Sequence, residues 1–262
     1  MFKSFVYLVC AACVALPAHA YTPDARAAVV QAWQQYRQGV QSEQELIEVR
    51  VTQDGQAVQE KRLWRRIQNG AQGQKLSIKF VAPADDQGLG LLVERGFVDG
   101  DQIWLRLPSW SGGRKVVGNR ELKYFADTGF TFEDSKQLIG ESAALFDYRY
   151  LPPTAQGALV VATPKPGVLS GYARREICLN AQGVPVKTDY FDADGQLIKT
   201  LSFEAISFAA PGRWRADRIV LRHFQQHSVT VLTVKQRQFN VATADSLFTL
   251  PYLLEPENAL VR

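Results

Sequence analysis

The chain has 262 residues, of which 46% are hydrophobic and 21% charged, and its formal net charge is +4. A chain of this size buries roughly 70% of its unfolded surface on folding, so a single domain needs neither disulfides nor a structural metal. The small net charge and the lack of a long basic run in the sequence argue against nucleic-acid binding.

Residues 1–20 have the three-part layout of a secretory signal peptide. Lys3 precedes an apolar run, which ends in a small-x-small pattern at Ala20. We therefore expect cleavage after Ala20, a single domain over residues 21–262, and a location in the periplasm. The alternative is a lipid anchor on Cys13. Later apolar runs in the sequence stay below the roughly 18 residues of a membrane span, so we expect the mature chain to be soluble.

The first element of the mature chain is a helix over Asp24–Gln38, which Thr22 or Asp24 caps and Gly39 ends. After it, most apolar residues alternate with period two. Such alternation is typical of strands that bury one face, hence of an antiparallel sheet. Turn residues between the alternating runs predict hairpins at Asp54-Gly55, Asp99-Gly100, Gln182-Gly183 and Asp194-Gly195.

The pattern predicts roughly ten or eleven strands, with further helical pieces only near residues 133–139 and 244–247. A sheet of this size must curl or close to cover its apolar face. The predicted fold is therefore mainly β, of the α+β type. A large curved antiparallel sheet forms an incomplete β-barrel, with the N-terminal helix and short lid helices over its open side. Because these helices are few, we expect part of the concave face to be unfilled.

Metal and catalytic motifs are weak throughout. His223 and His227 are four residues apart but have no third ligand at a recognisable spacing, so a turn between two strands is the favoured interpretation. Cys178 is expected in a buried strand, where a thiol is inert. Asp192 and Asp194 precede a glycine without the remaining ligands of a calcium loop. We predict no metal, no cofactor and no catalytic group.

Two segments suggest binding instead. Tyr124–Asp134, YFADTGFTFED, mixes aromatic and acidic residues, and Asp134 is placed to cap a short helix. Its phenylalanines would then be apolar plugs, and its other acids would face solvent. The glycine-rich loop Ser109–Lys115 carries Arg114 and Lys115, which either contact an acidic partner or a lipid head group, or are simply solvated.

The order of short motifs along the chain resembles that of the LolA-like lipoprotein carriers, in the outer membrane lipoprotein-sorting branch. The resemblance rests on IKFVAP (78–83), GLGLLV (88–93), IWLRLP (103–108), GGRK (112–115), DTGFTFED (127–134), ADGQLIKT (193–200) and FTLPYLLE (248–255). Gly129 stands where the branch has an aspartate, and Asp127 stands where it has a glycine. The resemblance implies a half-open β-barrel whose apolar cavity shields acyl chains in the periplasm.

The first hypothesis is thus a monomeric, non-enzymatic carrier of acyl chains that meets membranes or an inner- or outer-membrane partner transiently. The predicted cavity lining and its lid are Leu76, Ile78, Phe80, Leu91, Ile103, Leu105, Leu107, Phe130 and Phe132. We expect glutamate at Ile78 or Leu105 to abolish binding and a change at Lys79 to spare it. The alternatives are an accessory or sensor module of an RND-type exporter or envelope-stress system, and an enzyme acting on lipid or glycan through His223 or Asp134.

Overall fold

The computed structural model describes residues 24–71, 73–96, 100–138, 140 and 142–256. The predicted signal peptide, Cys13 and Asp99 lie outside the described residues. The helices are α1 (Ala25–Arg37), α2 (Phe132–Gln137) and α3 (Leu250–Leu254), with short 3-10 turns η1 (Ala84–Asp86), η2 (Gly118–Leu122), η3 (Ala143–Leu145) and η4 (Asp245–Phe248). The predicted helices at 24–38, 133–139 and 244–247 are confirmed to within a few residues.

The strands in the described part of the chain are β1 (Ser42–Gln53), β2 (Gln56–Asn69), β3 (Gly73–Ala82), β4 (Gly90–Gly96), β5 (Gly100–Arg106), β6 (Arg114–Val116), β7 (Phe146–Thr154), β8 (Gly157–Pro164), β9 (Arg174–Leu179), β10 (Pro185–Phe191), β11 (Leu197–Ala210), β12 (Arg213–His223) and β13 (Ser228–Phe239). They form one 13-stranded antiparallel sheet in the order β6-β5-β4-β3-β2-β1-β13-β12-β11-β10-β9-β8-β7. The predicted incomplete barrel is confirmed, with more strands than the sequence pattern indicated. β1 pairs with β13 and so joins the two halves of the sheet.

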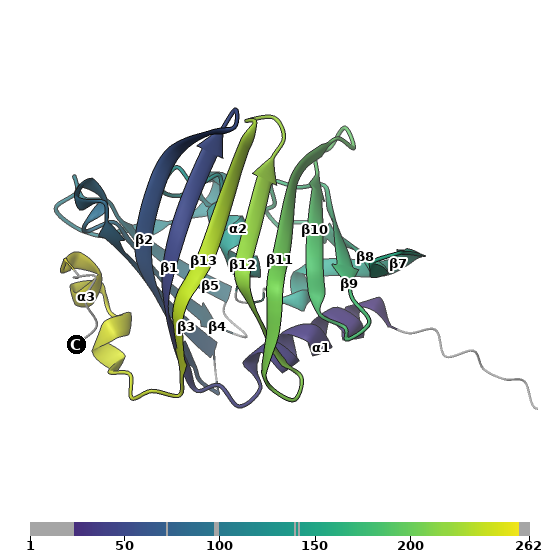
Figure 1. Ribbon diagram of the computed structural model, residues 1–262, viewed down its shortest axis with the longest axis horizontal. Coiled ribbons are helices and arrows are strands. Elements are labelled where there is room, and N and C mark those ends of the chain that lie inside the picture. Colours follow the sequence, from purple (N-terminus) through teal and green to yellow (C-terminus); the bar gives the residue numbers. More distant parts are fainter. Residues whose placement is uncertain (1–23, 72, 97–99, 139, 141, 257–262) are drawn as a thin grey trace, which may run out of the picture.

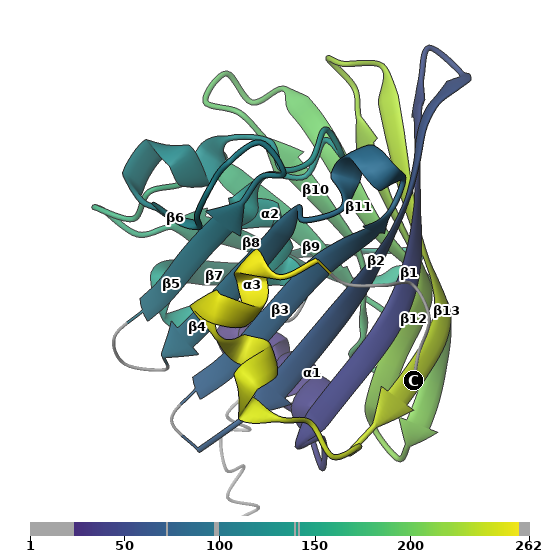
Figure 2. The ribbon, with the colours of Figure 1, turned by 90° about the vertical axis from the view of Figure 1, so that its left-hand side faces the viewer.

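The sheet curves around α2, which lies on its concave side (Figures 1 and 2). α1 packs on β12 and β7 at one end of the strands. Asp24 caps α1, since its carboxylate accepts a hydrogen bond from the backbone N–H of Arg26 over 2.9 Å. Two aromatic residues of this helix, Trp33 and Tyr36, contact Trp214 of β12 with ring centroids 5.3 and 5.0 Å away. The predicted N-terminal helix therefore closes one end of the concave face.

The outer face of the sheet is partly covered as well. α3 lies across β3 and β4 (Figure 2), where Phe248, Leu253 and Leu92 form a small apolar cluster. Lys79 is completely buried beneath this segment, and its Nζ donates to the backbone carbonyl of Tyr252 over 2.7 Å. Lys79 thus lies opposite the predicted lining residues, and the C-terminal segment covers this part of the outer face. None of the described helices is both long and apolar enough to cross a bilayer.

Candidate functional site: the concave face and its plug

The predicted lining residues come together on the concave face. Leu76, Ile78 and Phe80 of β3 alternate with residues of the outer face, and β4 and β5 continue the same surface with Leu91 and Ile103. These side chains are buried, whereas Leu105 and Leu107 are half-buried at the margin of the same cluster. The predicted lid residues Phe130 and Phe132 also belong to it. The role of this surface in lipid binding stays a prediction.

Residues 124–138, which we call the plug, fill the concave face in this structure. Phe125 packs on Phe80 and on Phe132, with ring centroids 5.8 and 5.4 Å apart. The space that remains between Phe132 and β3–β5 is a cavity of about 10 Å³. Such a cavity holds about one water molecule. Over β3–β5, the concave face that was expected to be partly open is therefore covered by the plug.

The plug contains its own helix start. The Thr131 hydroxyl accepts a hydrogen bond from the backbone N–H of Asp134 over 3.0 Å, and the Asp134 carboxylate accepts one from the N–H of Thr131 over 2.8 Å. This reciprocal capping box satisfies two N–H groups at the start of α2. The predicted capping role of Asp134 is confirmed, with Thr131 as the residue that precedes the helix.

Buried charges hold the plug on the sheet. Lys199 of β11 donates from Nζ to Oδ2 of Asp134 over 2.8 Å and to the carbonyl of Gly129 over 3.1 Å. The Tyr172 hydroxyl donates to the other oxygen of Asp134 over 2.5 Å. Burial and the nearby Asp134 carboxylate raise the pKa of Tyr172 well above its ordinary value. This phenol therefore stays protonated as a donor.

Glu133 makes the second anchor. Its carboxylate pairs with the guanidinium group of Arg175 on β9 and accepts a hydrogen bond from the backbone N–H of Gly171 over 2.7 Å. Both side chains are almost fully removed from solvent. The prediction that the acids other than Asp134 face solvent holds for Asp127, which is exposed, and is wrong for Glu133. Nothing in the local sequence distinguishes the two, since Arg175 is 42 residues away.

His223, at the end of β12, contacts the plug. Its Nε2 lies 2.9 Å from the hydroxyl of Tyr124, and its Nδ1 accepts a hydrogen bond from the backbone N–H of Gln226 over 3.3 Å. Burial and the Lys199 ammonium group lower the pKa of His223 to about 4. His227 lies in the exposed turn to β13. Within the described residues, no group of three or more His, Cys, Asp or Glu side chains could hold a metal ion.

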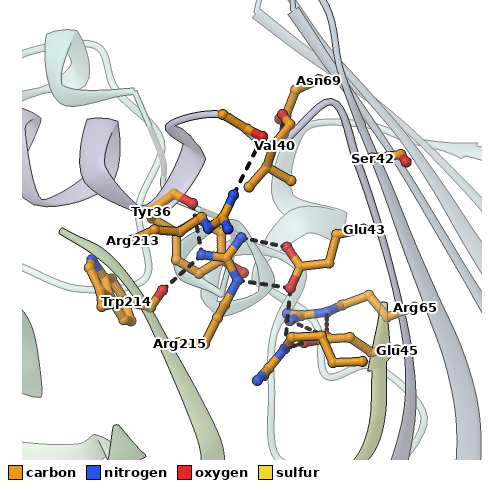
Figure 3. A network of polar contacts seen from close by, with 12 residues as sticks. Tyr36, Val40, Ser42, Glu43, Glu45, Arg65, Asn69, Arg213, Trp214 and Arg215 are labelled. Atoms are coloured by element: carbon orange, nitrogen blue, oxygen red, sulfur yellow. Dashed lines mark hydrogen bonds and ion pairs between the residues drawn. The ribbon is translucent and has the colours of Figure 1, made fainter. Parts of the chain in front are cut away.

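A second buried polar network anchors α1 (Figure 3). Arg215 forms a two-pronged pair with Glu43, at 2.8 and 2.7 Å, and donates to the carbonyl of Tyr36 at the end of α1 over 2.7 Å. Arg65 donates to Glu45 over 2.6 Å. The burial of these charges was not predicted from the sequence. Their signal was present, because Glu43 and Glu45 have the same parity along β1 as the buried Ile47.

Arg114 and Lys115 lie on the edge strand β6 and are exposed. The Arg114 guanidinium group stacks on Trp110, 4.1 Å from the ring centroid. The Lys115 ammonium group lies 5.6 Å from the ring centroid of Trp104. These two residues are thus not part of the buried cluster on the concave face, and their contact with a head group or partner stays a prediction.

Comparisons with known proteins agree with this fold. A family model with the description "Uncharacterized protein" matches residues 72–255. No curated protein matches the sequence. A Vibrio parahaemolyticus domain assigned to the outer membrane lipoprotein-sorting proteins has a TM-score of 0.77 and 19% identity, covering 87% of this chain and 97% of that one.

Two further solved structures are similar over their whole length. A DUF1329 family protein from Desulfovibrio piger has a TM-score of 0.76 and 21% identity, covering 88% of this chain and 100% of that one. A LolA superfamily protein from Nitrosomonas europaea has a TM-score of 0.65 and 17% identity, covering 88% and 99%. Because the family model matches well over half of the chain, the protein belongs to that family, and its fold is the LolA-like fold expected from its motifs.

Proposed function

We propose that this protein is a periplasmic carrier that binds the acyl chains of a lipid or lipidated protein on its concave face and moves them toward the outer membrane. One observation carries the proposal. The apolar side chains of β3–β5 are covered by an irregular segment, the plug, and not by a second sheet or a long helix. A cover of this kind can be replaced by a ligand without taking the sheet apart.

The energies of the two occupants are comparable. Phe125, Phe130 and Phe132 are each at least 94% buried. Burial of one such side chain contributes about 1.5–3 kcal/mol, and each buried CH₂ group of an acyl chain contributes about 0.8 kcal/mol. An acyl chain of about twelve carbons, at roughly 10 kcal/mol, therefore offsets the loss of all three phenylalanines. The apolar contributions of the two occupants thus nearly cancel, and the buried ion pairs of the plug determine how readily it moves.

Uptake on this face requires the plug to move. The cavity of about 10 Å³ beside Phe132 cannot hold an acyl chain. The buried ion pairs of Asp134 and Glu133 set the resistance to that movement, since separating them leaves charges without partners. We therefore expect acyl binding to expose residues 124–138 to solvent, which hydrogen exchange of these amides measures.

The direct test combines native mass spectrometry of the protein from the periplasm with titration of a fluorescent fatty acid. Val49→Glu introduces a charge at a concave residue that is 2% exposed, and Val58→Glu makes the same change at a residue that is 50% exposed. We expect only the first to abolish binding. Leu105→Glu, at a half-buried position that tolerates a charge better, is the second variant if Val49→Glu fails to fold.

No co-purifying lipid together with no fatty-acid binding would refute the carrier. Capture of a partner protein that survives removal of lipid would instead favour the accessory or sensor module. Contact with a membrane or acidic partner is assigned in this proposal to Arg114 and Lys115. Replacing both by glutamine should weaken binding to anionic vesicles and leave the fatty-acid titration unchanged.

A further inference from the structure

A separate pocket of about 250 Å³ lies between α1 and the ends of β3 and β4. Arg26, Val30, Trp33 and Arg37 form one wall, since residues three or four apart share one side of a helix. Gln74, Arg95, Gly140 and residues 142–144 form the other wall. The pocket adjoins the concave core through Trp33, which belongs to both.

The charge of this pocket is one-sided. Its described lining contains three arginines and no carboxylate. Arg95 is neutralised by Asp101, with 3.0 Å between Nε and Oδ1. Arg26 and Arg37 form no ion pair with any residue that the structure describes. Burial and the neighbouring charge of Arg95 lower the pKa of Arg37. Among the described residues, two cationic groups therefore line the pocket without a compensating charge.

The arginine end of the pocket is tightly built. Arg95 donates from Nη1 to the carbonyl of Gly140. A Cβ atom placed on Gly140 would lie 2.9 Å from Nη1 of Arg37 and 2.8 Å from the ring of Trp33, so backbone, guanidinium and indole are in close contact. Arg95 is 5% exposed. Arg37 and Arg95 thus both approach Gly140. Arg95 is already bound to Asp101 and to the carbonyl of Gly140, which leaves Arg37 as the guanidinium group at this end without an ion pair to a described residue.

Besides Gln74 and Ser142, the rest of the described lining is made of apolar side chains and two glycines. Val30, Trp33, Ala143 and Ala144 lie beside the arginine end. Arg26 is eleven residues from Arg37, about 16 Å along the helix axis, so it adds positive potential and makes no contact with the same anion. Planar guanidinium groups bind phosphate through paired hydrogen bonds. An apolar surface next to such a site suits an amphiphile.

We propose that this pocket binds the phosphate-bearing head group of an acyl lipid, with Arg37 as the principal ligand. The inference rests on the proposed carrier function and specifies its cargo. The apolar wall at Val30 and Trp33 then takes the first carbons of the lipid, and the concave face takes the acyl chains. Neutral lipids of the same chain length should bind more weakly.

The test is isothermal titration of the whole mature protein with dihexanoyl phosphatidic acid, with uncharged dihexanoylglycerol and with inorganic phosphate. We expect the phosphatidic acid to bind at least about tenfold more tightly than the glyceride, since loss of a charge-assisted hydrogen bond of about 1.5–3 kcal/mol changes a dissociation constant by that factor or more. Arg37→Gln should remove the difference, and Arg37→Lys should keep part of it. Arg50→Gln, on an exposed side chain paired with Glu60, is the matched control.

Equal affinities for the acid and the glyceride would overturn the inference and leave acyl binding intact. Inorganic phosphate bound as tightly as the phosphatidic acid would overturn the assignment to a lipid head group. A further variant replaces Glu141, which lies outside the described residues. Tighter lipid binding by Glu141→Gln would identify an internal carboxylate as the occupant and overturn the proposal. If phosphate binding depends on Arg37 but no acyl chain binds, the carrier function is refuted and the anion site at Arg37 is not.

Discussion

The Nζ atom of Lys199 lies 2.8 Å from Oδ2 of Asp134, and both side chains are almost completely buried. The two residues are 65 positions apart in the chain, on β11 and in α2. A buried charge that loses its partner destabilises a protein strongly. This pair therefore holds the plug in one position on the concave face and opposes any state in which the plug moves away.

Lys199→Met should lower the free energy of unfolding by about 3–5 kcal/mol, because Asp134 then stays buried without its cation. The double variant Lys199→Met/Asp134→Asn should recover part of this loss. Urea denaturation measures both. Arg50→Met breaks an exposed pair with Glu60 and should change the free energy by about 1 kcal/mol or less. If Lys199→Met lowers the free energy of unfolding as little as Arg50→Met does, the buried pair does not anchor the plug.

Stability should fall in mildly acidic solution because of His223. The pKa of His223 is lowered from 6.5 to about 4 by burial and by the Lys199 ammonium group. Between these values the unfolded state binds the proton and the folded state does not, so the stabilisation is complete above pH 6.5 and is lost as the pH falls toward 4. His223→Gln should flatten this part of the profile, measured as the urea midpoint at each pH. His227→Gln, in the exposed turn, serves as the control. The same slope in His223→Gln and wild type would contradict the assignment.

Gly140→Ala should be more destabilising than Gly55→Ala. Both glycines have a positive φ, +82° and +79°, which alone costs alanine about 1–2 kcal/mol. A Cβ atom at Gly55 has open space around it, whereas at Gly140 it collides with Trp33 and Arg37. Overpacking adds about 1–3 kcal/mol. The difference between the melting temperatures of the two variants measures the cost of the steric collision at Gly140. Equal losses of stability would mean that α1 shifts to relieve the collision.

Phe248→Ala should release the C-terminal segment from the outer face of the sheet. Phe248 is 1% exposed and packs with Leu92 and Leu253. We expect faster hydrogen exchange in residues 245–255, with fatty-acid binding on the concave face preserved. Phe208→Ala is the matched change at a residue that is 48% exposed, and it should leave the exchange of this segment unaltered. Loss of fatty-acid binding in Phe248→Ala would show that the two faces are coupled.

Local sequence was sufficient for the elements whose signals are local. The capping residue Asp24 and the turn at Asp54-Gly55 depend on neighbours in the chain, and each is found as predicted. In β3 the predicted apolar set lies in the core, but the opposite face is buried as well. The strands that the pattern missed are β6, which has three residues, and β7, which contains two adjacent prolines. Short length and proline both weaken the periodic signal of a strand.

The burial of the charged side chains does not follow from local sequence. Charged side chains are almost never fully buried unless they are paired, so an isolated lysine or glutamate favours a surface prediction. Lys79 is buried because the C-terminal segment, more than 170 residues later, supplies carbonyl oxygens to it. Glu133 is buried because Arg175 meets it across the concave face. The partner of each charge, and hence its burial, depends on the complete fold.

The sequence by itself determined the period-two apolar faces, the helix at the start of the mature chain and the turns between strands, because these follow from interactions within a few residues. The tertiary structure decided what occupies the concave face. Phe125, Phe130 and Phe132 pack there because Lys199 and Arg175, on strands far along the chain, bind the two acids that follow Phe132. Aromatic and acidic residues next to one another can form a plug only where a sheet offers an apolar surface and buried cations together.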